Sequence, residues 1–353
     1  MSVTEDATET SAVQESESKH SVRLRVLYIV GAGRSGSTVL DTVLGHHSDV
    51  IGVGELANLH CLGWLTGDVC ACGQRSQECE FWSRVRDEWQ RLVPEATVEK
   101  YIRLQEKFER VRWLSLRRWA RFWIERFWPS LDGRAYLRQT EALFQAIAFV
   151  SGRATIVDSS KSPMRAAWLS RIASLDVRLL HLIRDARAVV WSRAKTYKVD
   201  VNSGITRDFR RKPTVIAVGY WLWINLVTLC VRHQTAAAAL ELKYEDFVSH
   251  PAKALDRISD WSGLDFSATS RALLEGAAIQ PEHTIAGNRV RMSGSMKLKP
   301  DWEWTEKLPQ RDRRVCWLLA GWMQKRFGYS RETTVLALET HAEPAWLACR
   351  SQP

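Results

Sequence analysis

Residues 24–38 read LRVLYIVGAGRSGST, and they carry the clearest structural signal in the sequence. Residues 24–30 are mainly β-branched and aliphatic, which predicts a strand buried on both faces. Glycines follow at once, and residues 36–45 then have the spacing of a helix. A turn between a strand and a helix presents backbone N–H groups and the positive helix end to an anion. The stretch therefore predicts a phosphate-binding loop within an α/β domain.

Further short apolar runs along the chain are each followed by a polar turn and a helical pattern. They cover residues 49–53, 154–157, 177–183 and 240–242. This alternation predicts a P-loop-like, doubly wound α/β fold, with a central parallel sheet flanked by helices. The long interruption at 56–151 predicts a cysteine loop followed by an α-helical insert.

The remaining chain divides by composition. Residues 1–21 have five acids, one Lys and little apolar surface, which predicts a disordered acidic tail. One catalytic domain is expected over 22–330, with a C-terminal extension over 331–353. We find no signal-peptide pattern and no run of about 18 apolar residues, so we expect a cytoplasmic protein.

The formal net charge of +10 favours anionic partners. Nucleic acid, an acidic membrane surface and a multiply phosphorylated small molecule all satisfy this requirement, and charge alone does not choose among them.

The glycine loop at 31–38 fits two other motifs in part. Gly31 and Gly36 have the spacing of a nucleoside triphosphatase loop, but Ser37 stands where that loop needs Lys. Gly31, Gly33 and Gly36 also satisfy the dinucleotide fingerprint, with Glu55 19 residues after Gly36. Four polar side chains favour a third interpretation, a loop that binds a small anion, because they bring a guanidinium and three hydroxyls to one turn. They are Arg34, Ser35, Ser37 and Thr38.

A second anion-binding pattern lies at 179–193, LLHLIRDARAVVWSR, which again predicts a strand running into a helix. Arg184 comes at the strand end, and Ser192 lies about two turns along the helix. Asp185 is expected to cap this helix.

With both patterns in place, the chain resembles the PAPS-dependent sulfotransferase superfamily, in its bacterial, carbohydrate- and tyrosylprotein-type branch. The resemblance implies that 3′-phosphoadenosine 5′-phosphosulfate (PAPS) is the co-substrate. Its 5′-phosphate would contact Gly33, Arg34, Ser35, Gly36, Ser37 and Thr38, and its 3′-phosphate would contact Arg184 and Ser192.

Two further segments extend the resemblance. Residues 158–161, DSSK, place Lys161 as a candidate contact to an anionic oxygen. Residues 283–291, HTIAGNRVR, resemble a C-terminal nucleotide loop, which implies cofactor contacts from Arg289 and Arg291.

Sulfuryl transfer needs a base for the acceptor hydroxyl and donors for the leaving group. Glu55 is the expected base, because residue 54 ends a strand parallel to the first, and the branch carries a Glu at a matching place. Arg34 is expected to stabilise the leaving group. His46 and His47 are alternative bases. No catalytic metal is expected, because the transferring group carries less charge than a terminal phosphate.

Four of the seven cysteines cluster at 61, 70, 72 and 79. The cluster could bind zinc, form a disulfide or stay reduced, and because its spacing fits no standard finger, no metal is assigned.

Residues 110–128 combine Trp and Arg at helical spacing. They predict a helix packed on the core, a lid over the acceptor, or a peripheral contact with anionic lipid.

The expected function is transfer of a sulfuryl group to a hydroxyl of a small-molecule, sugar or lipid acceptor, without nucleic acid as partner. The alternatives are an ATP-dependent phosphotransferase of P-loop type and a non-catalytic protein that binds anionic membrane or nucleic acid.

Overall fold

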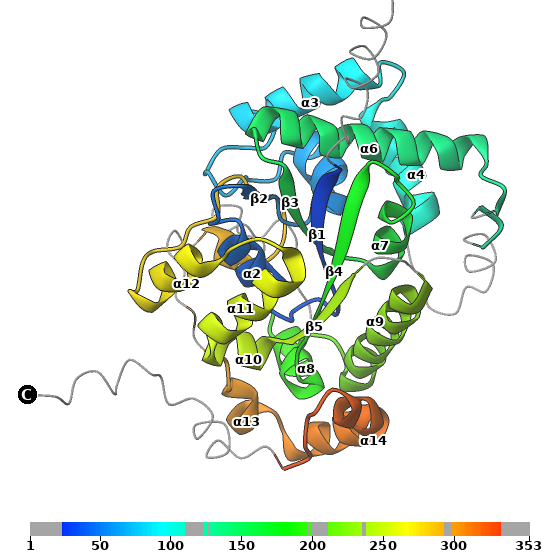
Figure 1. The fold of residues 1–353 in the computed structure, drawn as a ribbon. Helices are drawn as coiled ribbons and strands as arrows, with labels where there is room; N and C mark the ends of the chain where they lie inside the picture. Colours follow the sequence, from blue (N-terminus) through cyan, green and yellow to red (C-terminus); the bar gives the residue numbers. More distant parts are fainter. Residues whose placement is uncertain are drawn as a thin grey trace, which may run out of the picture.

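A central sheet of parallel strands organises the computed structural model, which describes residues 23–109, 123–125, 127–196, 198, 211–234, 238–292, 298 and 300–332. Its strands are β1 (Leu24–Val30), β2 (Val50–Gly52), β3 (Thr155–Lys161), β4 (Leu175–Ile183) and β5 (Ala239–Lys243), in the order β2-β3-β1-β4-β5 (Figure 1). Every pairing in the sheet is parallel. The α/β fold class and all five predicted strand positions are confirmed.

The side chains of β1 alternate between two cores, as a strand covered on both faces requires. Val26, Tyr28 and Val30 belong to one apolar cluster, and Leu27 and Ile29 to the other. Helices α6 (Leu131–Ser151), α7 (Pro163–Leu169) and α9 (Thr214–Gln234) cover the first face. Helices α2 (Ser37–Leu44), α10 (Tyr244–Ser249), α11 (Pro251–Ser262) and α12 (Ser267–Leu274) cover the second (Figure 1).

A third apolar cluster lies beyond the carboxyl ends of the strands. It is formed by α8 (Ala186–Ala194), α9, α13 (Glu303–Lys307) and α14 (Gln310–Arg326).

The insert between β2 and β3 is helical over most of its described length. It contains η1 (Leu56–Asn58), η2 (Leu59–Leu65), α3 (Glu80–Leu92), α4 (Val98–Glu109) and α6. Residues 110–122 and 126 lie outside the described part, so the expectation for the Trp and Arg segment concerns mainly undescribed residues. Of that segment, Phe127 and Trp128 are exposed. The tail at 1–21 and most of the extension at 331–353 also lie outside the described residues.

The expectation that no long apolar run occurs is wrong for α9. Residues Thr214–His233 are long and apolar enough to cross a membrane by length and composition. One such helix is weak evidence of a span, because a core helix passes the same test. Trp221, Val227 and Val231 are buried on α9, and the helix packs against α7, α8, α14 and β4.

Candidate functional site

Most of the predicted site residues lie at the carboxyl edge of the sheet, around the ends of β1 and β4 and of the neighbouring strands β2 and β3. The chain leaving β1 travels toward β2 on one side, and the chain leaving β4 travels toward β5 on the other. In open α/β sheets, the crevice at such a switch point is where ligands bind.

The glycine loop between β1 and α2 requires its glycines at two positions. Gly36 has φ 88, and a Cβ there would lie 2.3 Å from the ring of Tyr244. Gly31 has φ 144, and its Cβ would lie 2.4 Å from the carbonyl oxygen of Leu182. At both positions φ is positive and a side chain would clash with a neighbouring residue, so glycine is required. The two glycines therefore allow the turn that leads into α2.

Arg34 joins the glycine loop to the second anion-binding pattern. Its backbone has φ 77, and its Nε donates to Ser192 Oγ on α8 at 3.0 Å. Arg184 in turn donates from Nη1 to the Arg34 carbonyl oxygen at 3.0 Å. Two motifs predicted separately from the sequence are therefore one continuous polar corner.

Some buried donors in this corner have no acceptor among the described residues. They include Arg184 Nε and the hydroxyl of Ser35. The rest of the Arg184 side chain is held, because Nη2 contacts Asp301 at 2.9 Å and the guanidinium lies 4.5 Å from the ring centre of Tyr244. Buried donors without partners are costly, and oxygens of a phosphate group would satisfy both.

A carboxylate and an ammonium lie on the other side of the glycine loop. Lys161 ends β3 with φ 68, and its Nζ contacts Glu55 Oε1 at 2.5 Å. Asn58 Nδ2 donates to the second carboxylate oxygen at 2.8 Å. Glu55 lies three residues after the end of β2, at the same edge of the sheet as the glycine loop.

The segment at 284–291 packs across the glycine loop and Glu55. The N–H of Asn288 donates to Thr38 Oγ1 at 3.2 Å, and the N–H of Glu55 donates to the Ile285 carbonyl at 3.0 Å. The side chain of Arg289 lies outside the described part. Arg291 does not join the anion site: its buried Nη2 contacts both oxygens of Asp68, at 3.0 and 3.1 Å. Because Asp68 is the counter-ion, Arg291 instead ties this segment to the insert.

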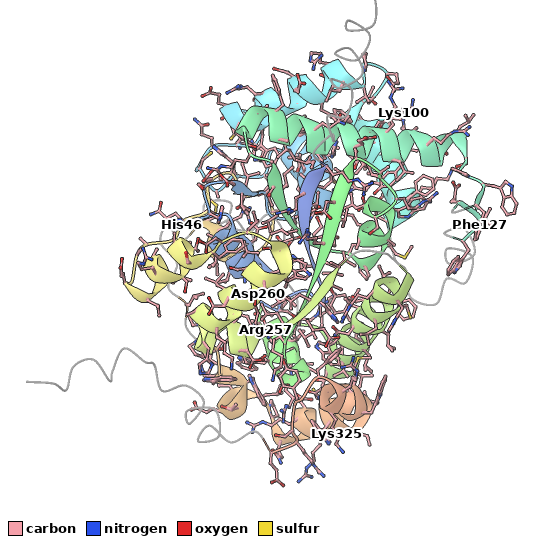
Figure 2. The ribbon with its side chains drawn as sticks, viewed as in Figure 1. His46, Lys100, Phe127, Arg257, Asp260 and Lys325 are labelled. Carbon is pink, nitrogen blue, oxygen red and sulfur yellow. The ribbon has the colours of Figure 1, made fainter. Side chains whose placement is uncertain are left out.

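His46 and His47 are not near the site. Helix α2 runs from the glycine loop back toward the amino ends of the strands, and both residues follow its last turn. His46 is exposed at the periphery (Figure 2), and the His47 ring packs on Phe266 with centroids 5.1 Å apart. A parallel sheet places helix C-termini at the edge opposite its ligand site, which removes both as bases.

Several contacts at the site come from residues without a local sequence signal. The hydroxyl of Tyr220 accepts from the Gly33 N–H at 3.0 Å, although Tyr220 lies on α9, 187 residues away. Asp301 and Tyr244, which hold Arg184, also come from distant segments. Asp185 caps α8 as predicted, by accepting from the N–H of Arg187.

A buried acid beneath the site gives a pH prediction. Burial raises the pKa of Asp41 to about 8, although the Gly54 N–H donates to its carboxyl group. The native protein then keeps a proton that the unfolded chain releases above its ordinary pKa of 3.8. The free energy of unfolding should fall as pH rises between these two values, by up to about 1.4 kcal/mol per pH unit.

Asp41→Asn should remove this slope. Urea unfolding of both proteins at about pH 5 and about pH 8 measures this effect. Between the two pH values, the free energy of unfolding of the variant should rise relative to that of the parent by up to about 4 kcal/mol. Parallel stability curves would mean that Asp41 ionises normally in the fold.

Comparisons with known proteins identify the family of this chain. A family model described as the sulfotransferase family matches residues 27–268. A search of curated proteins finds no match. Among solved structures, the sulfotransferase domain from the Synechococcus PCC 7002 olefin synthase is 20% identical with a TM-score of 0.43, covering 88% of this chain and 97% of that one. Sulfotransferase STF9 from Mycobacterium avium is 13% identical with a TM-score of 0.45, covering 91% and 81%. Because the family model matches more than half of the sequence, the chain belongs to the sulfotransferase family.

Proposed function

We propose that this protein transfers the sulfuryl group of PAPS to a hydroxyl of a small-molecule, sugar or lipid acceptor. One observation carries the proposal: the order of charged groups along the carboxyl edge follows the strand order. Glu55 comes after β2, Lys161 ends β3, the glycine loop follows β1, and Arg184 follows β4. A nucleotide with phosphates at both ends of its ribose suits such a row.

In this arrangement the 3′-phosphate binds Arg184 and Ser192, and the 5′-phosphate binds the glycine loop. The Arg34 contact with Ser192 makes the two sites adjacent. The unpartnered donors Ser35 Oγ and Arg184 Nε supply one hydrogen bond to each phosphate. The transferable sulfonate then points toward Lys161 and Glu55.

The reaction forms a bond from the acceptor oxygen to sulfur and breaks the bond from sulfur to the 5′-phosphate oxygen. Glu55 takes the proton of the acceptor hydroxyl. Lys161 and Arg34 stabilise negative charge on the sulfonate and on the leaving phosphate. The products are the sulfated acceptor and adenosine 3′,5′-bisphosphate.

The main rival is an ATP-dependent phosphotransferase, which requires a carboxylate for magnesium near the loop. The buried carboxylate on β3, Asp158, is already bound by Arg165 Nε at 3.0 Å and by the Ser160 N–H at 2.9 Å. With Ser37 in place of the loop lysine, this arrangement favours the sulfonate donor.

Arg184→Ala should weaken binding of adenosine 3′,5′-bisphosphate roughly ten- to hundredfold, the loss of a charge-assisted contact worth about 1.5–3 kcal/mol. Calorimetric titration without magnesium measures this, with ATP and NAD as competing ligands. Arg103→Ala, which removes an exposed arginine of α4, serves as the matched control and should bind like the parent. Equal or better binding of ATP or NAD by the parent would refute the proposal.

The acceptor is sought with labelled PAPS and a panel of phenols, glycosides and hydroxylated lipids. A peripheral membrane contact through 110–128 belongs to the same proposal and predicts a preference for lipid acceptors presented in anionic vesicles. A cytoplasmic location is also proposed, supported by the free thiols of the six described cysteines.

A further inference from the structure

Three cysteines of the insert and one distant histidine converge on a single point. The sulfurs of Cys70, Cys72 and Cys79 and a ring nitrogen of His283 all lie within 4.8 Å of one another. Cys70 and Cys79 are buried, His283 is half-buried and Cys72 is exposed. Cys61, which is close to them in sequence, is outside the group.

The distances between these atoms are those of a tetrahedral zinc site. Zinc bonds of about 2.3 Å to sulfur and about 2.0 Å to nitrogen place sulfurs about 3.8 Å apart, and sulfur about 3.5 Å from nitrogen. Cys79 Sγ lies 3.7 Å from Cys72 Sγ and 3.9 Å from Cys70 Sγ. His283 Nδ1 lies 3.4 Å from Cys79 Sγ and 3.8 Å from Cys70 Sγ. A disulfide would join only two of the three thiols, whereas here all three sulfurs lie within 4.8 Å of the same nitrogen.

Surrounding contacts position the His283 ring and the backbone of Cys70. The His283 ring stacks on Phe81 with centroids 4.7 Å apart and planes at 9°, and the His283 carbonyl accepts from Trp82 Nε1 at 2.9 Å. The Cys70 N–H donates to the Gln74 carbonyl at 2.8 Å, which closes a turn that contains both Cys70 and Cys72. Such outer contacts fix ligand orientation in metal sites.

We propose that Cys70, Cys72, Cys79 and His283 bind one structural Zn²⁺ ion. Three thiolates and an imidazole at tetrahedral spacing select zinc among common divalent ions, and four protein ligands leave no open position for catalysis. The sequence alone assigns no metal here, because His283 lies 204 residues beyond Cys79.

The ion would join the insert to the segment that packs over the active site. Two residues after His283, Ile285 pairs with the backbone beside Glu55, and three residues further on, Asn288 contacts Thr38. A link at His283 therefore anchors the start of this segment, and the buried pair of Arg291 with Asp68 anchors its end. The ion should stabilise the fold, and any effect on nucleotide binding through this segment rests on the proposed function.

The test measures metal in the full-length protein purified without added metal. Elemental analysis after dialysis against EDTA should find about one zinc per chain. Cys72→Ala, which changes the exposed ligand, should lose zinc under the same dialysis and unfold at a lower temperature. Cys61→Ala, in the same insert but outside the group, and Cys230→Ala, exposed on α9, are matched controls that should retain the ion.

A second measurement does not depend on the variants folding. The parent protein with Co²⁺ in place of zinc should show the visible absorption of a tetrahedral site with thiolate ligands. A metal-free parent protein, a disulfide between any two of these cysteines in the parent, or equal zinc retention by Cys72→Ala and the controls would each overturn the proposal. Because zinc content is measured without substrate, an inactive but zinc-loaded protein would count against the proposed reaction alone.

Discussion

Glu55→Gln should lower kcat by about 10²–10⁴-fold, the usual contribution of a positioned general base. The amide is nearly isosteric with the carboxylate, but it cannot take the proton of the acceptor hydroxyl. The affinity for adenosine 3′,5′-bisphosphate should change little, because the proposed contacts to its two phosphates come from the glycine loop, Arg184 and Ser192 and not from Glu55. Steady-state kinetics with PAPS measures the fall in kcat, and calorimetry measures the affinity for the bisphosphate.

The acidity of the acceptor separates a base from a merely structural residue. Acceptors with more acidic hydroxyls need less help in losing a proton, so the kcat deficit of Glu55→Gln should shrink along a series of increasingly acidic phenols. Glu95→Gln, on the surface beside Arg138, is the matched control and should behave like the parent. An equal deficit across the series, or a loss confined to nucleotide binding, would assign Glu55 to structural support of Lys161.

The sequence predicts those parts of this molecule whose signals are local. An apolar run followed by a polar turn is sufficient to find each strand, because a buried parallel strand must be apolar on both faces. The glycine loop and the pattern of Arg184 with Ser192 are local in the same way. Parallel strands bring their carboxyl ends to one edge, so placing Glu55 beside the loop also follows from sequence.

Features that depend on long-range pairing could not be predicted. Arg291 has the composition of a phosphate ligand, yet its partner Asp68 lies 223 residues earlier, and no local pattern shows that pair. The contact of Tyr220 with the Gly33 N–H and that of His283 with the cysteines also join residues that are far apart in the sequence. The hypothesis that His46 or His47 is the base is wrong. It rested on their proximity to the loop in sequence and did not account for the length and direction of α2.

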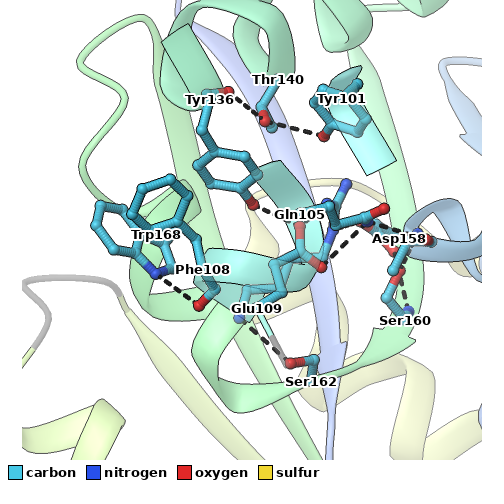
Figure 3. A network of polar contacts seen from close by, with 12 residues as sticks. Tyr101, Gln105, Phe108, Glu109, Tyr136, Thr140, Asp158, Ser160, Ser162 and Trp168 are labelled. Carbon is cyan, nitrogen blue, oxygen red and sulfur yellow. Dashed lines mark hydrogen bonds and ion pairs between the residues drawn. The ribbon is translucent and has the colours of Figure 1, made fainter. Parts of the chain in front are cut away.

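A buried ion network behind the site should contribute strongly to the stability of the fold. Arg165 on α7 is fully buried, and its guanidinium contacts Glu109 Oε1 at 2.5 Å and Asp158 Oδ2 at 3.0 Å. The hydroxyl of Tyr136 also donates to Glu109 (Figure 3). The network thus joins α4 and α6 of the insert to β3, three residues before Lys161.

Arg165→Met should cost about 3–5 kcal/mol of unfolding free energy, because it leaves two carboxylates buried without their cation. That loss is a large share of the roughly 5–15 kcal/mol that stabilises a typical domain. Arg138→Met, which breaks the exposed pair with Glu95, should cost at most about 1 kcal/mol in the same urea titration. Neutralising the partners as well, in Arg165→Met with Glu109→Gln and Asp158→Asn, should recover much of the stability, since no charge is then left unpaired. If the single variant were as stable as Arg138→Met, the carboxylates would have to be protonated or hydrated in the native protein. The insert would then be held to β3 by its apolar contacts alone, and the position of Lys161 beside Glu55 would not depend on this network.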